Sequence, residues 1–238
     1  MEGASWREAR PLEVDEYGAM GPLFRDRIDA GRRLAAALPP TWVRPDAVVL
    51  GLPRGGVVVA AEVARWHGLP LDVFVVRKLG VPGQEELAMG AIASGDVVVE
   101  NEEVIRLLGI PPQVVAAVAA REREEVRRRE RLYRGDAPPL DLRGRSVILV
   151  DDGLATGSTM RAAIRAARAR AAGPVYVAVP VGAADSCAVV GAEADDALCL
   201  FTPEPFHAVG LWYGRFDQVG DDEVRALLVA ARTPEANR

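Results

Sequence analysis

The sequence reads Val147-Ile148-Leu149-Val150-Asp151-Asp152-Gly153-Leu154-Ala155-Thr156-Gly157-Ser158-Thr159 in its second half. Four apolar residues lead directly into two carboxylates, and a loop of small and hydroxyl residues follows. A short apolar run before the start of a helix predicts a strand that is buried on both faces of a parallel sheet. Ligands bind beyond the carboxyl ends of such strands, so the two carboxylates lie where a site is expected.

Other short apolar runs alternate with helical segments on both sides of this stretch. Such alternation predicts an α/β fold with a parallel twisted sheet and helices on both faces. The expected strands span about 46–52, 71–76, 145–150, 175–181 and 196–201. The expected helices span about 22–38, 57–67, 102–108, 112–134, 156–172, 184–190 and 221–231.

One domain is expected over residues 22–232, after an N-terminal extension over 1–21. The helices over 101–134 form an insert between the second and third strands. Residues 202–232 form a small C-terminal hood that ends in a helix. The domain is therefore a parallel-sheet core with two additions of its own.

Two turn-forming segments precede the insert. Residues 78–89 contain Gly80, Pro82 and Gly83 and show little periodicity, which predicts a mobile loop. Ser94-Gly95-Asp96 lies between 91–93 and 97–100 and predicts a hairpin turn.

Composition favours a cytoplasmic protein. The net charge of −5 gives no general attraction to nucleic acid or anionic lipid. No apolar run approaches the roughly 20 residues needed to span a bilayer, and the acidic first 20 residues do not read as a secretory signal. No membrane partner is expected. Cys187 and Cys199 form no metal motif, so buried thiols in a reducing compartment are expected.

The acidic strand end suits a ligand that carries both hydroxyls and a phosphate. Backbone N–H groups at a helix start attract anions, and Thr156, Ser158 and Thr159 add hydroxyl donors. Capping and a tight turn would explain one acidic residue, but two adjacent carboxylates after an apolar strand are costly without a function. A nucleoside-triphosphate P-loop is excluded because no G-x-x-x-x-G-K-[ST] motif occurs. A ribose 5-phosphate, with nearby Mg²⁺, fits the pattern.

This pattern resembles the signature of the type I phosphoribosyltransferases. That signature consists of an apolar strand, then two acidic residues, then a short loop that ends in Thr-Gly and a hydroxyl residue. The stretches VRKLGVPGQEELAMGAIASG (76–95) and FHAVGLWYGRFDQVGDDEV (206–224) look like an uncharacterised bacterial branch of that family. The resemblance implies binding of 5-phosphoribosyl-1-pyrophosphate (PRPP). Asp151 and Asp152 would contact the ribose hydroxyls and, indirectly, the metal. The 5-phosphate would be wrapped by Ala155, Thr156, Gly157, Ser158 and Thr159.

A second loop follows the first strand as Leu52-Pro53-Arg54-Gly55-Gly56. Two glycines expose backbone N–H groups, and the Arg54 guanidinium fits phosphate oxygens. The resemblance implies that this is the pyrophosphate loop, which often holds a non-proline cis peptide; a plain strand-to-helix turn is the alternative.

The second strand ends in Arg77 and Lys78, and Lys78 is the only lysine in the chain. The resemblance places a basic residue here near the pyrophosphate; a solvated charge is the alternative. The predicted pyrophosphate-binding residues are Pro53, Arg54, Gly55, Gly56, Arg77 and Lys78. The predicted catalytic residues are Arg54, Lys78, Asp151 and Asp152.

The resemblance implies an enzyme that uses PRPP and Mg²⁺ to transfer phosphoribosyl to a nitrogenous base or amine and releases pyrophosphate. A PRPP-sensing regulator that binds nucleic acid is the main alternative, although the net charge makes nucleic acid an unfavoured partner, and an accessory to a hydrolase is a third. The acceptor is open, and a homodimer is consistent with the family.

Residues 121–134 hold seven arginines and four glutamates, which favours a solvated helix. The aromatic cluster Phe206, His207, Trp212, Tyr213 and Phe216 suits either base stacking or packing.

Overall fold

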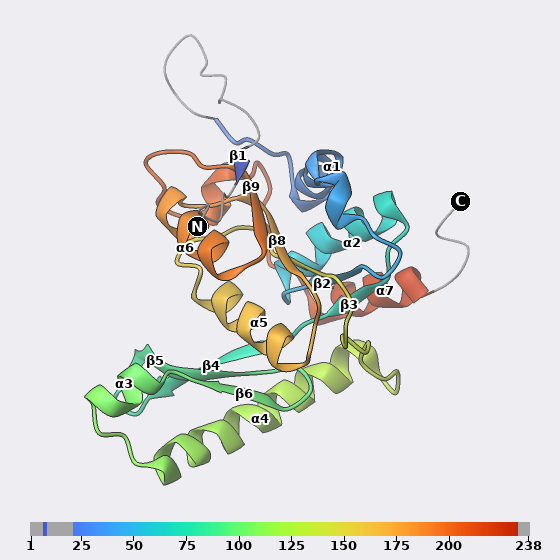
Figure 1. Ribbon diagram of the computed structural model, residues 1–238. Helices are drawn as coiled ribbons and strands as arrows, with labels where there is room; N and C mark the ends of the chain where they lie inside the picture. Colours follow the sequence, from blue (N-terminus) through green and yellow to red (C-terminus); the bar gives the residue numbers. More distant parts are fainter. Residues whose placement is uncertain (1–6, 9–20, 233–238) are drawn as a thin grey trace.

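A parallel sheet forms the centre of the computed structural model, which describes residues 7–8 and 21–232 (Figure 1). Among these residues, six strands pair in the order β1-β9-β8-β7-β2-β3, and all neighbours run parallel. The strands are β1 (Arg7–Glu8), β2 (Val48–Gly51), β3 (Leu71–Val73), β7 (Val147–Val150), β8 (Val175–Val181) and β9 (Asp196–Phe201). The predicted α/β fold with a parallel sheet is confirmed.

Helices cover both faces of the sheet because its central strands are apolar on both sides. Val49 belongs to one buried cluster, with side chains of α1, α2 and α7. Val48 and Leu50 belong to the other, with side chains of α5 and α6. Alternate residues of a strand point to opposite faces, so a continuous apolar run feeds two cores. The helices are α1 (Arg27–Ala37), α2 (Gly55–His67), α5 (Ser158–Ala169), α6 (Ala184–Glu193) and α7 (Asp221–Arg232).

The segment between β3 and β7 forms a second, antiparallel sheet followed by two helices. Its strands pair in the order β4-β5-β6 and are β4 (Val76–Val81), β5 (Gln84–Ala93) and β6 (Val97–Glu100). The helices are α3 (Glu102–Leu107) and α4 (Pro112–Arg134), in agreement with the helices predicted over 102–134. In Figure 1 this sheet lies between α5 and α4.

The predicted mobile loop over 78–89 is wrong, because most of it lies in β4 and β5. Leu79 and Met89 are fully buried against α4. A register shift beside Gly80 breaks the alternation of the two strands, which hides the strand signal in the sequence. The predicted turn over 94–96 is confirmed, with positive φ at Gly95 and Asp96.

The insert is anchored to the edge of the main sheet by a buried ion pair. Arg134, in the last turn of α4, donates from Nε to Asp72 Oδ1 of β3 over 2.9 Å. Its NH2 group donates to the carbonyl of Val73 over 2.6 Å. The C-terminal end of α4 is therefore fixed relative to β3.

The two cysteines form a disulfide, so the predicted thiols are wrong. Cys187 lies on α6 and Cys199 on β9, with their Cα atoms 6.4 Å apart. Packing of α6 on the sheet brings the two together, and their spacing in the sequence carries no signal for that packing.

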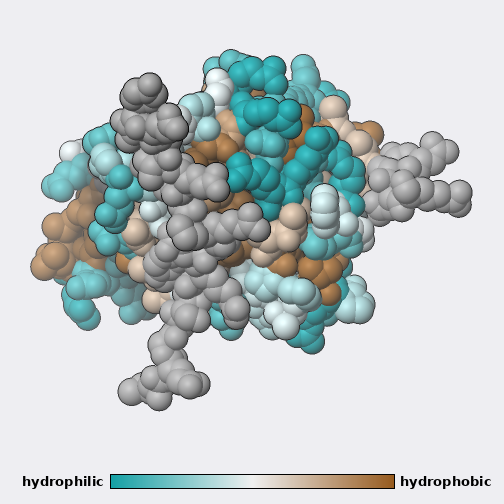
Figure 2. All heavy atoms as spheres, turned by 90° about the horizontal axis from the view of Figure 1, so that it is seen from above, coloured by the Kyte–Doolittle hydropathy of each residue, from teal (hydrophilic) through white to brown (hydrophobic). Residues whose placement is uncertain are grey.

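Two short 3-10 helices, Pro40–Trp42 and Val209–Trp212, complete the described structure. The second lies in the predicted hood, which packs on the start of α1 through contacts of Tyr213 with Phe24. On the face shown in Figure 2, polar side chains predominate and apolar areas lie between them. No helix among the described residues has the length and apolar character needed to cross a bilayer.

Candidate functional site

Asp151 and Asp152 lie directly after β7, at the carboxyl edge of the main sheet. The backbone N–H of Asp152 donates to Asp151 Oδ1 over 2.9 Å. Burial and the neighbouring Asp152 carboxylate raise the pKa of Asp151 well above its usual range. Burial also raises the pKa of Asp152, against the opposing effect of a hydrogen bond from Arg27. The pair therefore concentrates negative charge where water is scarce, and a cation or hydroxyl donors would stabilise it.

Arg27 of α1 is the functional residue that the sequence did not reveal. Its Nε donates to Asp152 Oδ2 over 2.7 Å, and its NH1 donates to the carbonyl of Asp217 over 2.8 Å. The guanidinium also lies 3.8 Å from the ring centroid of Phe216. Arg27 stands 125 residues from Asp152 in the chain, among other arginines of α1, so no local pattern marks it.

The start of α2, at Gly55 and Gly56, packs directly against the acidic pair. A Cβ on Gly55 would collide with Asp152 Oδ2, and a Cβ on Gly56 would lie 2.7 Å from Asp151 Oδ1. The Pro53–Arg54 peptide just before it is cis. The structure thus brings the predicted pyrophosphate loop against the acidic pair, and only glycine fits at positions 55 and 56.

The predicted phosphate loop over Ala155 to Thr159 is open to solvent at its hydroxyl groups. Thr156, Ser158 and Thr159 are exposed, and α5 begins at Ser158. Gly157 has a φ of 71°, a left-handed conformation that favours glycine. The Ser186 hydroxyl of α6 donates to the carbonyl of Ala155 over 2.6 Å, which holds the loop from below. The first turn of α5 therefore presents exposed hydroxyl groups and a helix N-terminus, which are features that can bind an anion.

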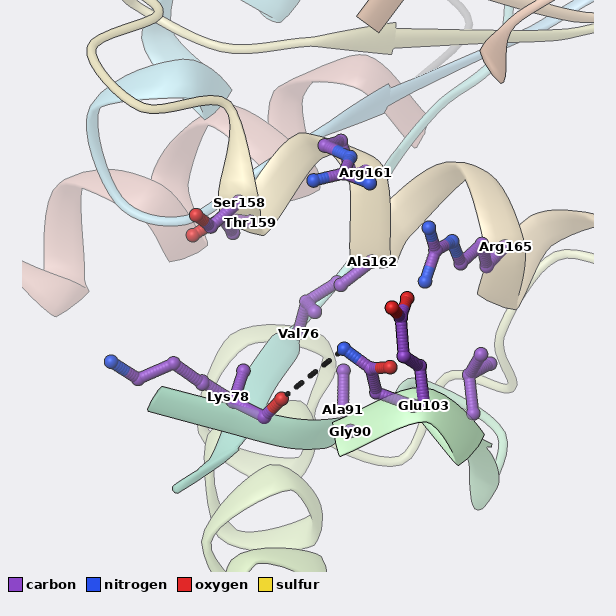
Figure 3. A pocket seen from close by; sticks show the side chains of 13 residues that line it. Val76, Lys78, Gly90, Ala91, Glu103, Ser158, Thr159, Arg161, Ala162 and Arg165 are labelled. Atoms are coloured by element: carbon purple, nitrogen blue, oxygen red, sulfur yellow. Dashed lines mark hydrogen bonds between the residues drawn. The ribbon is translucent and has the colours of Figure 1, made fainter. Parts of the chain in front are cut away.

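Lys78 and Arg77 point to opposite sides of β4, as neighbours in a strand do. Arg77 donates from Nε to Glu122 of α4 over 2.9 Å. Lys78 lines a cavity of about 250 Å³ between the second sheet and α5. Figure 3 shows Ser158, Thr159 and Arg161 across this cavity from Lys78.

Arg54 lines a different cavity, of about 390 Å³, beside α4 and α7. Its NH1 lies 3.8 Å from Asp221 Oδ1. The structure thus places the two predicted catalytic cations in separate cavities: Lys78 near the phosphate loop, Arg54 beside α4.

The aromatic cluster of the hood divides into packed and exposed members. Tyr213 donates from its hydroxyl to the carbonyl of Asp152 over 2.5 Å, and burial raises its pKa. Phe216 stacks on Arg27. His207 is exposed. Contact with the acidic pair therefore accounts for Tyr213, whereas Phe216 contacts Arg27 and Tyr213 and is 36% exposed.

The carboxylates of Asp151 and Asp152 can hold a hard cation such as Mg²⁺ only if a bound ligand supplies further oxygen atoms. In the described part of the chain, no three His, Cys, Asp or Glu side chains form a metal-binding group. The two carboxylates of Asp151 and Asp152 are the oxygen donors that Mg²⁺ prefers, and Mg²⁺ commonly shares phosphate oxygens of a substrate. The residues present therefore fit a magnesium ion that arrives with a phosphorylated ligand.

Comparison with known proteins assigns these features to one family. The model of the phosphoribosyl transferase domain matches residues 25–190. Proteins of two Mycobacterium tuberculosis strains that bear the name of phosphoribosyl transferases are each 48% identical over 206 residues, or 87% of this chain. The chain spans 46% of the length of those relatives. A crystal structure of a Thermus thermophilus protein superimposes with a TM-score of 0.80 at 43% identity, covering 88% of this chain and 98% of the other.

Proposed function

Because this chain belongs to the phosphoribosyl transferase family, we propose that it binds PRPP with Mg²⁺ and transfers the phosphoribosyl group to a nitrogenous base or amine. One observation carries the proposal: the Gly55-Gly56 turn touches the Asp151 and Asp152 carboxylates, and the open start of α5 follows six residues after Asp152. One PRPP molecule would then bind the pyrophosphate loop, the acidic pair and the phosphate loop at the same time.

In the proposed reaction, a nitrogen lone pair attacks the anomeric carbon of the ribose. The bond from that carbon to the pyrophosphate oxygen breaks, and its electron pair leaves with pyrophosphate. Positive charge develops on the ribose ring and negative charge on the leaving group. Asp151 and Asp152 are the residues that would hold Mg²⁺, which when bound would neutralise phosphate charge.

Each loop of the chain has a distinct part in this reaction. Asp151 and Asp152 accept hydrogen bonds from the ribose hydroxyls and orient the sugar. Thr156, Ser158 and Thr159 bind the 5-phosphate together with the backbone N–H groups of the first turn of α5. The Arg54 guanidinium and the N–H groups of Gly55 and Gly56 receive the pyrophosphate charge.

Lys78 is the remaining predicted catalytic cation. Because it lines the cavity beside Ser158 and Thr159, the placement favours a contact near the 5-phosphate more than one at the pyrophosphate loop. Arg77 is engaged by Glu122 through its Nε and NH2 groups, so a part in binding would fall to the donors that Glu122 does not use.

The alternative of a nucleic-acid-binding regulator has less support. Most of the α4 arginines that suggest a basic surface are engaged by carboxylates. Arg127 contacts Asp96 over 2.5 Å, and Arg134 is buried against Asp72 over 2.9 Å. Ion pairs of this kind reduce the positive field that a phosphate backbone would meet.

Binding calorimetry tests the proposal. PRPP titrated with Mg²⁺ is expected to bind the parent protein and to lose affinity strongly in the double variant Asp151→Asn/Asp152→Asn. Asp222→Asn is the matched control, since the Asp222 side chain is 98% exposed on α7. Unchanged PRPP affinity in the double variant would contradict the assignment. A screen of nucleobases and amines, read by pyrophosphate release, then identifies the acceptor.

A further inference from the structure

The cavity beside Arg54 brings together three arginines from two parts of the fold. Arg54 comes from the loop after β2, whereas Arg128 and Arg129 come from α4. The other lining residues are Pro53, Tyr133 and Asp221. The cavity volume of about 390 Å³ is large enough for a phosphorylated group and its water.

The orientation of the two α4 arginines is fixed from one side. Glu125 accepts hydrogen bonds from Arg128 Nε over 2.8 Å and from Arg129 Nε over 2.7 Å. These contacts lower the pKa of Glu125 to about 2, so the carboxylate stays ionised at neutral pH. A guanidinium has five N–H donors, and one shared carboxylate leaves several of them on each arginine for an anion.

The far wall of the cavity also favours an anion over a cation. The Tyr133 hydroxyl donates to Asp221 Oδ1 over 2.9 Å, and burial raises the pKa of Tyr133 to about 12. The tyrosine is therefore neutral, and its hydroxyl occupies one oxygen of Asp221. Three guanidiniums thus face two carboxylates, Asp221 and Glu125, which leaves positive charge around the cavity.

We propose that this cavity binds a diphosphate group, with Arg128 and Arg129 of α4 as its binding residues opposite Arg54. The inference rests on the proposed function, in which the diphosphate is that of PRPP. It gives the insert a role: α4 supplies the second wall of the pyrophosphate subsite. Arginine suits the role because its planar fork binds two phosphate oxygens at once.

Calorimetry with three separate probes tests the inference: pyrophosphate, PRPP and ribose 5-phosphate, each with Mg²⁺ at one fixed ionic strength. The variant is Arg128→Ala/Arg129→Ala. The control is Arg121→Ala/Arg131→Ala, which removes two exposed arginines of the same helix that do not line the cavity. The expected result is at least about tenfold weaker binding of pyrophosphate and PRPP in the variant alone, with ribose 5-phosphate unchanged.

Two results would overturn the inference, and a third requires a second variant. If the Arg128→Ala/Arg129→Ala variant binds pyrophosphate within about twofold of the parent affinity, the cavity is not a diphosphate site. The proposed function still stands in that case if PRPP binding depends on Asp151. Weaker pyrophosphate binding with unchanged PRPP binding removes the assignment to the substrate and leaves a separate site for a free diphosphate. Loss of all three ligands points to a folding defect, and Arg128→Lys/Arg129→Lys then decides. The lysine variant keeps the charge, so it must fold and still bind pyrophosphate more weakly than the parent.

Discussion

Arg27 Nε lies 2.7 Å from Asp152 Oδ2 and joins the first turn of α1 to the end of β7. Both side chains are largely buried, with 11% and 16% of their surfaces exposed. The same guanidinium contacts Phe216 and the carbonyl of Asp217. Arg27 therefore links the hood to the acidic pair, in addition to the direct hydrogen bond from the Tyr213 hydroxyl to the Asp152 carbonyl.

Replacing Arg27 by methionine should weaken PRPP binding and destabilise the fold. Asp152 would be left buried without its ion pair, which costs about 3–5 kcal/mol in comparable cases. The pKa of Asp152 should rise further, because the opposing effect of Arg27 is removed. Urea denaturation measures the first effect and PRPP calorimetry the second. Arg25→Met is the control, since the Arg25 side chain is 78% exposed. An Arg27→Met protein with parental PRPP affinity would show that Arg27 is only structural.

Replacing Gly55 by alanine should abolish PRPP binding with a smaller effect on the fold. The new Cβ would meet Asp152 Oδ2 and the Arg27 guanidinium, so either the turn or the carboxylate must move. Gly21→Ala is the matched control, because a Cβ there meets nothing within 4 Å. Normal PRPP affinity in Gly55→Ala would show that the close approach of the two loops has no part in binding.

The sequence predicted the core of the fold well because its signals are local. The strand β8 over 175–181 and the helix α4 over 112–134 occur where periodicity places them. Gly55-Gly56 and the acidic pair were each expected after a strand of the parallel sheet, and the pairing of β2 with β7 makes these two strand ends neighbours. Strand ends that share an edge are predictable once the strands are known.

The residues that the sequence did not reveal depend on long-range packing. Arg27 reaches Asp152 only because α1 packs beside α2 with its first turn next to the end of β7. Cys187 meets Cys199 only because α6 packs on β9. The strands β4 and β5 were hidden by the register shift at Gly80, because a bulge breaks the period of two that marks a strand.

Stability should fall as the pH rises through the titration of Asp151. Its pKa in the folded protein is raised above the ordinary value of 3.8. The folded state then holds a proton that the unfolded chain has lost, so its contribution is complete below pH 3.8 and disappears above the folded pKa. Asp151→Asn should remove this dependence and make the protein more stable than the parent at pH 7. Denaturation curves measured across the pH range provide the check.

The pKa of Asp46 is shifted in the opposite direction to that of Asp151, so its effect on stability has the opposite pH dependence. Hydrogen bonds from the backbone and hydroxyl of Ser146 lower its pKa, so its contribution is present above pH 3.8 and is lost as the pH falls through the lower folded value. Asp46→Asn should therefore lose stability at neutral pH. If Asp151→Asn also loses stability there, the acidic pair is not under the strain that burial implies.

Reduction of the Cys187–Cys199 disulfide should destabilise the protein by about 2–4 kcal/mol, because the bond closes a short loop and restricts the unfolded chain. The effect should extend to the phosphate loop. Ser186 precedes Cys187 on α6 and holds the Ala155 carbonyl at 2.6 Å, so a looser α6 loosens that support. Denaturation with and without a thiol reductant measures the first effect, and ribose 5-phosphate calorimetry measures the second. Cys187→Ser/Cys199→Ser should behave like the reduced parent and show no response to reductant. A parent protein that is equally stable in both conditions would mean that the two sulfur atoms contribute by packing alone.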